Sequence, residues 1–207
     1  MQTHTLCLAI LALSCVEAHA QNANPPPAVD GSYTATATTY VVPDSRNYVE
    51  GVFTADRRWL HLEGRYNYEN LETGSAWVGY NFNLGSKVRL DVTAMVGAVF
   101  GRTTGIAPGE RLTFNWRRFE LYSEAEYVFS TDTRADSFFY SWSELSLSPY
   151  HWLRMGLAGQ RTQAYQSEHK LQRGFLLGFE HKRMGITAYV LNPDRRAVYI
   201  VSAQVEF

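Results

Sequence analysis

The chain ends in the stretch AVYIVSAQVEF, residues Ala197 to Phe207, in which apolar residues occupy alternate positions. Tyr199, Val201 and Ala203 share one face with Val205 and Phe207, and the opposite face is polar from Ser202 onward. A period of two is typical of a β-strand with one apolar face. The pattern recurs at Leu60 to Tyr68, Val88 to Phe100 and Phe119 to Phe129. Helical spacing does not compete over a comparable length, so the sequence predicts an all-β fold.

Turn signals divide this pattern into twelve segments, which we expect to form a closed antiparallel barrel. The predicted strands are Ser32 to Val41, Asn47 to Ala55, Arg58 to Tyr68, Ser75 to Leu84, Lys87 to Phe100, Glu110 to Trp116, Phe119 to Phe129, Ser137 to Leu147, His151 to Thr162, Leu171 to Glu180, Met184 to Leu191 and Ala197 to Phe207. All seven prolines fall outside these segments, as expected because proline cannot donate to a strand ladder.

The predicted connections alternate between short turns and longer loops. An outer-membrane barrel joins its strands in this way, with the short turns and both termini at the periplasmic end. The alternation depends on a hairpin at Arg117-Arg118, which splits Glu110 to Phe129 into two strands. Without that hairpin the count falls to ten strands, which stays the alternative.

The composition limits the function classes. Of 207 residues, 45% are apolar and 19% are charged, with 19 Lys and Arg against 20 Asp and Glu. Such a chain can fill a core, and it has no basic excess to meet nucleic-acid phosphates. No run in the mature chain approaches the 18 apolar residues of a transmembrane helix, whereas barrel strands only need to alternate.

The first 20 residues have the features of a secretory signal peptide. An apolar run from Leu6 to Val16 precedes Ala18-His19-Ala20, which suits cleavage before Gln21. A lipoprotein signal at Cys15 is the weaker alternative. The mature chain then has no cysteine, which a periplasmic or outer-membrane protein accommodates. We expect a Pro-rich linker at residues 21–31 and the barrel at residues 32–207.

Aromatic residues indicate which faces meet lipid. Trp59, Trp116 and Trp152 each lie beside a predicted short turn, where a periplasmic girdle would place them. The alternative is that these tryptophans are ordinary core residues. A soluble periplasmic barrel that binds an apolar ligand would bury the same apolar stripes inward, and alternation alone does not separate the two arrangements.

Two further stretches add a family resemblance. The terminal strand ending in Phe207 resembles the one by which bacterial outer-membrane proteins are recognised for barrel assembly. FTADRRWLHLE, residues 53–63, and WVGYNF, residues 77–82, resemble a family of small proteobacterial outer-membrane proteins to which no activity is assigned. The resemblance implies location in the outer membrane, with lipid and the barrel-assembly machinery as partners. It brings no catalytic residues with it.

The residues themselves do not favour an enzyme. Membrane-barrel hydrolases place His and Ser two residues apart on one strand, and none of the four mature histidines has that spacing. His61 beside Glu63 could pair a base with an orienting group only if a serine came from another strand, and a lipid-modifying enzyme stays an alternative on that basis. No His, Asp or Glu grouping has metal-site spacing. We predict no cofactor and a monomer.

The polar strand faces carry the main functional information. If the apolar stripes face lipid, nine acids and three arginines face the interior: Glu63, Arg65, Glu69, Arg89, Asp91, Glu120, Glu124, Glu126, Glu144, Arg154, Glu180 and Glu206. Interior charges either pair into a plug or surround water and select solutes. The acid excess favours a narrow channel for small polar or cationic solutes, with a structural barrel of closed polar core as the alternative. The pore-lining candidates are Glu63, Arg65, Arg89, Asp91, Glu120, Glu124, Glu126 and Arg154.

Overall fold

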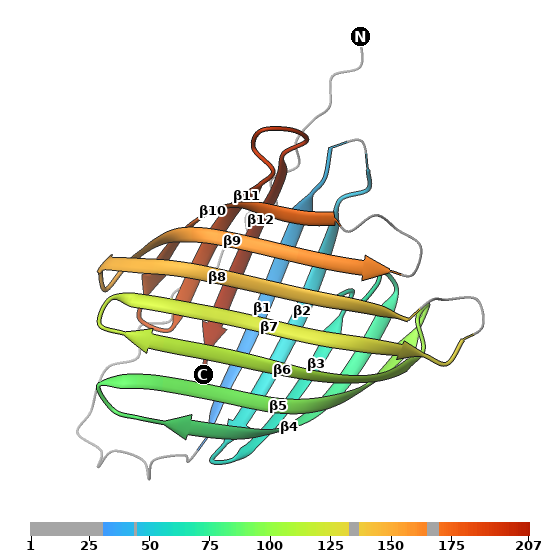
Figure 1. Cartoon of the computed structure of the whole chain (residues 1–207), viewed down its shortest axis with the longest axis horizontal. Coiled ribbons are helices and arrows are strands. Elements are labelled where there is room, and N and C mark those ends of the chain that lie inside the picture. Colours follow the sequence, from blue (N-terminus) through green and yellow to red (C-terminus); the bar gives the residue numbers. More distant parts are fainter. Residues whose placement is uncertain (1–30, 44, 133–136, 165–169) are drawn as a thin grey trace, which may run out of the picture.

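The structure, a computed structural model, describes residues 31–43, 45–132, 137–164 and 170–207. Within them, twelve strands form one closed antiparallel barrel in which each strand pairs with its neighbours in the sequence and β1 pairs with β12 (Figure 1). The strands are β1 (Ser32–Val41), β2 (Tyr48–Arg57), β3 (Leu60–Tyr66), β4 (Thr73–Leu84), β5 (Val88–Gly101), β6 (Gly105–Trp116), β7 (Phe119–Ser130), β8 (Phe138–Tyr150), β9 (Leu153–Ala164), β10 (Lys170–His181), β11 (Met184–Leu191) and β12 (Val198–Glu206).

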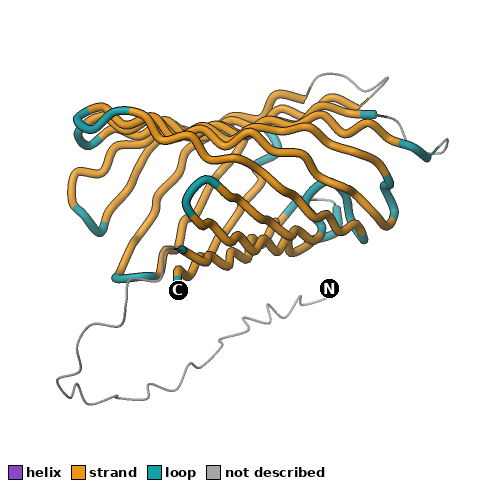
Figure 2. Tube along the Cα trace, turned by 90° about the horizontal axis from the view of Figure 1, so that it is seen from below, coloured by secondary structure: helices purple, strands orange, loops and turns teal. Residues whose placement is uncertain are grey.

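The twelve-strand count is confirmed, and so is the hairpin at Arg117-Arg118. Trp116 pairs with Phe119 across that turn, and Arg117 has a φ of 57°. A left-handed residue suits a two-residue hairpin because the turn then follows the twist of the strands. The described part of the chain contains strands and loops only (Figure 2), and no helix in it is long and apolar enough to cross a membrane.

Short turns gather at one barrel end together with the start of β1 and the end of β12, where Thr34 pairs with Glu206. The longer loops gather at the other end, as the alternation predicted. One link differs, because β6 begins at Gly105 and leaves only residues 102–104 as a loop. The signal peptide and all of the linker but Gly31 lie outside the described residues and stay predictions.

Two prolines contradict the expectation that all seven lie outside strands. Pro108 is in β6 and Pro149 is in β8. Pro108 pairs with Val96 on β5, but the ladder to β7 is interrupted between Ile106 and Gly109. Pro149 lies where the β8–β9 register shifts, between Leu147 and Tyr150. Both positions are irregularities that need no amide donor from the proline, which is why a strand tolerates them.

The outer surface of the barrel is apolar and the inner surface is largely polar. Large apolar side chains are exposed on every strand and beside the short turns, where Trp59 is 54% exposed. Trp116 and Trp152 are exposed as well, so these three tryptophans form an exterior girdle at the short-turn end. Burying the apolar stripes inward, as a soluble barrel would, is therefore excluded for the described strands.

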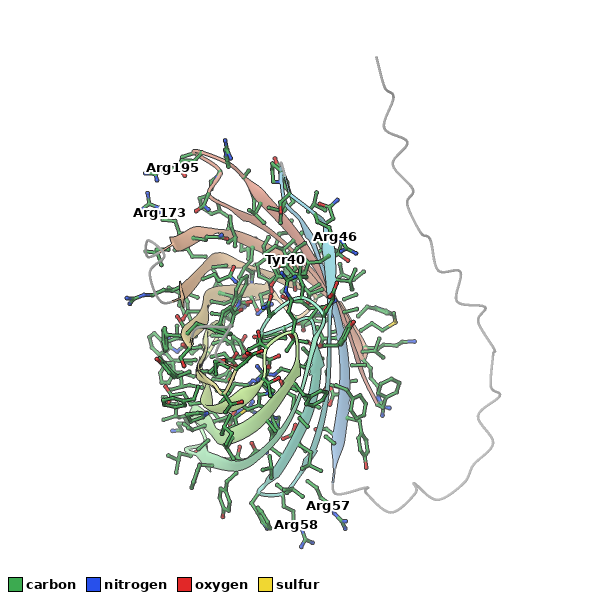
Figure 3. The ribbon with its side chains drawn as sticks, turned by 90° about the vertical axis from the view of Figure 1, so that its right-hand side faces the viewer. Tyr40, Arg46, Arg57, Arg58, Arg173 and Arg195 are labelled. Carbon is green, nitrogen blue, oxygen red and sulfur yellow. The ribbon has the colours of Figure 1, made fainter. Side chains whose placement is uncertain are left out.

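The interior near the long-loop end is filled by aromatic and aliphatic side chains. Directly paired inward residues Tyr48, Tyr40, Ile200 and Tyr189 form a row across β2, β1, β12 and β11. From the facing wall come Tyr68, Tyr140 and Trp142, with Tyr68 edge-on to Tyr140 and Trp142 edge-on to Tyr189. We call these seven residues the aromatic layer. Figure 3 shows Tyr40 inside the ring of strands.

A glycine on β5 makes room for a second interior cluster. Trp77 packs beside Met95, Val99 and Val128, and a Cβ built on Gly97 would lie 2.4 Å from an atom of the Trp77 ring. No real Cβ makes such a contact, so the ring or the strand must move if Gly97 is substituted. The interior of the barrel is thus closely packed at this point.

We expect Gly97→Ala to lower the free energy of unfolding by about 1–3 kcal/mol, the usual effect of overpacking a core. Urea titration followed by tryptophan fluorescence measures this change. Gly64→Ala is the matched control, since nothing lies within 4 Å of its added Cβ on the outer face of β3. Equal midpoints for the two variants would show that Trp77 is not held against Gly97.

Candidate functional site

Arg65 is the centre of a buried ion-pair cluster in the barrel interior. Its side chain is fully buried, and its Nη1 donates to Glu126 Oε2 at 2.7 Å. The guanidinium also pairs with Glu63, with Glu124 at 3.5 Å and with Glu69 at 3.7 Å. Four carboxylates therefore surround one arginine, and charge-assisted bonds of this kind are the strong ones in a site shielded from water.

Arg111 shares two of these carboxylates. Its Nη2 donates to Glu63 at 2.8 Å and lies 3.5 Å from Glu124. Arg65 and Glu63 are on β3, Arg111 is on β6 and Glu124 is on β7, and β3 neighbours neither β6 nor β7. These contacts cross the interior, so the two arginines connect β3 to β6 and β7 on another side of the barrel.

A second ion-pair cluster lies on β7, β8 and β9. Arg154 Nη1 donates to Glu144 at 2.9 Å and more weakly to Glu120 at 3.4 Å. Glu144 also accepts hydrogen bonds from Trp142 Nε1 and the Tyr189 hydroxyl, each at 2.8 Å. The aromatic layer is thereby fixed to the charged residues beneath it, because two of its rings donate to one buried carboxylate.

Between these clusters and the short-turn end lies a cavity of about 600 Å³. Its lining runs from Thr34, Lys182 and Glu206 near the short turns to the aromatic layer. Eight acids and four bases are among the lining residues: Glu50, Asp56, Glu63, Glu120, Glu124, Glu144, Glu180, Glu206, Arg111, Arg154, Lys182 and Arg183. The cavity is therefore an acidic vestibule at the predicted periplasmic end.

The structure divides the eight pore-lining candidates into three groups. Glu63, Glu120, Glu124 and Arg154 line the vestibule. Arg65 and Glu126 are buried in the cross-barrel cluster and do not line it. Arg89 and Asp91 pair with each other at the start of β5, where the Arg89 side chain is 61% exposed. A role in solute passage stays a prediction for all of them.

Five charged residues that line the vestibule were not predicted to face the interior: Glu50, Asp56, Arg111, Lys182 and Arg183. Arg111 belongs to an alternating polar set with Thr113 and Asn115, and this period of two was the available signal for it. Glu50 is 8% exposed on β2 and lines the vestibule. Its neighbours on the same face are Tyr48 and Val52, so apolar residues interrupt the polar pattern around it.

His61 is engaged on both ring nitrogens. Nδ1 lies 2.8 Å from Asp56 and Nε2 lies 2.9 Å from Glu63, while the ring itself is buried. Neither nitrogen is left for a serine hydroxyl, so this geometry does not support the base that a lipid hydrolase would need. Among the described residues, no group of three His, Cys, Asp or Glu side chains is arranged to hold a metal ion.

The closed barrel, its apolar exterior and its charged interior define the class of protein. A barrel of this kind spans a membrane because every strand edge is paired and the outer face is apolar. The chain is thus an outer-membrane β-barrel, and the predicted fold class and location are confirmed.

Comparison with solved structures supports this class. The chain is similar in fold to a structure described as a KdgM porin, with a TM-score of 0.57, 9% identity, and coverage of 84% of this chain and 99% of that chain. A second match, a KdgM porin in complex with disordered oligogalacturonate, has a TM-score of 0.58 and 10% identity over 85% of this chain and 99% of that chain. At this identity the likeness shows the fold alone. No protein-family model matches the chain, and no curated protein matches it in sequence.

Proposed function

We propose that the protein is a narrow outer-membrane channel for small polar solutes, with a preference for cations. The observation that supports this proposal is the acid excess of the vestibule, eight carboxylates against four basic residues. Charged rings in a water-filled passage attract counter-ions and repel ions of their own sign. The fold is shared with a porin, which makes passage of solutes a reasonable activity for a barrel of this shape.

The charge of the vestibule also bears on the solute class. One matching structure is described with oligogalacturonate, whose repeated carboxylates make it a polyanion. A net-acidic wall repels such a molecule, because the carboxylates of solute and protein would meet at short range. We therefore infer that this chain takes cationic or neutral polar solutes rather than an acidic oligosaccharide.

Passage requires movement at the aromatic layer. Among the described residues, the vestibule lining ends at Tyr40, Tyr140, Trp142, Tyr189 and Ile200, so a solute must displace these side chains to cross. Apolar constrictions stop ions by dewetting. The same closure, together with the ion pairs that cross the interior, favours a second candidate, a structural barrel with a closed interior.

Reconstitution in planar bilayers tests the proposal. In a KCl gradient the wild-type barrel is expected to conduct with a reversal potential of cation sign, and Glu120→Gln/Glu180→Gln should move that potential toward zero. Glu120 is paired only weakly with Arg154, at 3.4 Å, so its charge faces the vestibule. Glu124 and Glu126 are unsuitable for this test because Arg65 binds both.

Glu110→Gln is the matched control for selectivity. Glu110 is exposed on β6 and does not line the vestibule, so removing its charge should leave the reversal potential unchanged. If neither conductance nor solute-dependent liposome swelling is found in the wild type or in variants of the aromatic layer, the barrel is structural and the channel proposal fails.

A further inference from the structure

Two arginines project from the outer face of the barrel, within the surface that meets lipid. Arg161 on β9 and Arg173 on β10 are both exposed, and they alternate with the inward residues Ala158, Gly174 and Leu176. Figure 3 shows Arg173 outside the ring of strands, on the same side of the barrel as Arg195 of the β11–β12 loop. Charges on the lipid side of a barrel destabilise it unless something neutralises them.

The strand register places small and polar residues beside these arginines. One directly paired exterior row runs Ser123, Ser143, Gly159 and Arg173 across β7 to β10. The next row toward the long loops runs Ala125, Ser141, Arg161 and Leu171. We call Arg161, Arg173, Ser141, Ser143 and Gly159 the exterior arginine patch.

Apolar rows border the exterior arginine patch. On the short-turn side, Leu121, Leu145, Leu157 and Phe175 form the directly paired row immediately below it, and all four are exposed. On the long-loop side, Tyr127 pairs with Phe139, and Phe129 is exposed beyond them. The patch is therefore an interruption of the apolar exterior and not part of a polar rim.

The two guanidinium groups are close enough to act on one anion. Leu171 is directly opposite Arg161, and Arg173 is two residues further along β10. Such diagonal neighbours are about 7–8 Å apart at the backbone, within reach of long side chains. None of the ion pairs found among the described residues joins a carboxylate to either arginine, so two like charges lie side by side without an acidic partner there.

Their depth suits the outer headgroup region. Arg173 is six residues along β10 from Phe179, whose ring stacks on the girdle residue Trp152. That span is about 20 Å along the strand, or roughly 15 Å of height at the usual strand tilt. A guanidinium that extends further outward then reaches the edge of an apolar band about 25 Å tall.

We propose that the exterior arginine patch binds the phosphate of an anionic lipid in the outer leaflet. Two arginines provide paired donors in the fork geometry that phosphate accepts, and a phosphate monoester carries enough charge to neutralise both. The serines and Gly159 leave space beside the guanidinium groups for the headgroup, while the bordering leucines and Phe175 contact acyl chains.

A second copy of the chain is a less suitable partner for the exterior arginine patch, because it offers too little negative charge. The nearby exterior acid is Glu110, which lies in the Arg161 row through Ala125 and Ser141. It is three strands away, about 14 Å, which is beyond ion-pair range within one barrel. Across a dimer, one such carboxylate would neutralise one arginine and leave the other charged in lipid.

The test titrates the purified mature barrel in detergent with bis-phosphorylated lipid A, followed by native mass spectrometry. The comparison probes are the same lipid without phosphates, phosphatidylcholine and inorganic phosphate. Wild type should prefer the phosphorylated lipid. Arg161→Gln/Arg173→Gln should raise the Kd for this lipid by about tenfold or more, because charge-assisted bonds are lost. Arg195→Gln/Arg196→Gln, which removes the same charge from an exposed loop, and Glu110→Gln should leave the Kd unchanged.

Several outcomes would overturn the proposal. The proposal fails if wild type and the double arginine variant bind phosphorylated lipid A with equal affinity. It also fails if wild type binds the lipid without phosphates as tightly as the phosphorylated lipid. Competition by inorganic phosphate at the lipid's own concentration would point to a free-anion site. A wild-type dimer that Glu110→Gln and the arginine variant both dissociate would make the patch a contact between copies. Heat-modifiable gel migration checks folding, and Arg173→Gln alone serves if the double variant does not fold.

Discussion

Replacing Arg65 with methionine is expected to lower the free energy of unfolding by about 3–5 kcal/mol, the usual effect of removing one partner of a buried ion pair. The change would leave Glu63, Glu69, Glu124 and Glu126 with one fewer counter-charge inside the barrel. Glu63 and Glu124 keep Arg111, but no other arginine reaches Glu69 or Glu126 among the ion pairs of the described residues. Methionine keeps the apolar stem of the side chain, so the expected loss comes mainly from the guanidinium, its charge and its contacts.

The arginine also holds aromatic rings. Its guanidinium carbon lies 4.3 Å from the ring centroids of both Tyr68 and Trp77, so the charge is stacked between an aromatic-layer residue and the second interior cluster. Such cation–π contacts contribute more when they are shielded from water. Loss of Arg65 should therefore loosen both clusters at once, and Trp77 fluorescence should report it.

The measurement is urea titration of the folded barrel, with heat-modifiable migration as a second reading. Arg89→Met is the matched control, because Arg89 pairs with Asp91 at an exposed site and such pairs contribute about 0–1 kcal/mol. Adding Glu126→Gln to Arg65→Met should recover part of the stability by removing one of the two carboxylates that no other arginine reaches. Equal stability of the Arg65 and Arg89 variants would show that the cross-barrel cluster does not hold the fold.

The second large effect concerns the aromatic layer. Tyr40→Ala/Tyr189→Ala is expected to raise single-channel conductance several-fold, because it removes two rings from the row that closes the vestibule. A wider constriction is hydrated more easily, so ions cross it at a lower energetic cost and the conductance rises. The cation preference should persist, because the vestibule acids are unchanged.

The matched control for this experiment is Tyr33→Ala/Tyr199→Ala. Tyr33 on β1 and Tyr199 on β12 are both exposed and face away from the interior. The control therefore removes the same number of tyrosine rings from the same region of the sheet, but from its outer face. Conductance should stay at the wild-type level in the control. If the interior variant conducts no better than the control, the aromatic layer does not set the barrier.

The sequence by itself determined the strands, their order around the barrel and the face that each side chain takes. These features follow from local rules, because the period of two fixes the faces and turn residues fix the hairpins. The exterior girdle of Trp59, Trp116 and Trp152 followed from the same rules. The predicted placement of Pro108 and Pro149 outside the strands was wrong. Pro108 lies at a ladder gap and Pro149 at a register shift, and these features depend on the partner strand and leave no trace in the local pattern.

Only the tertiary structure decided what the interior residues contact. Closing the sheet brings β3 against β6 and β7, so Arg65 and Arg111 meet carboxylates from strands that do not neighbour their own. It also decided that Tyr40, Ile200 and Tyr189 close the vestibule, and that Arg161 and Arg173 are diagonal neighbours on the exterior. Strand pairing register and barrel closure set these distances, and alternation along a single strand carries no information about either.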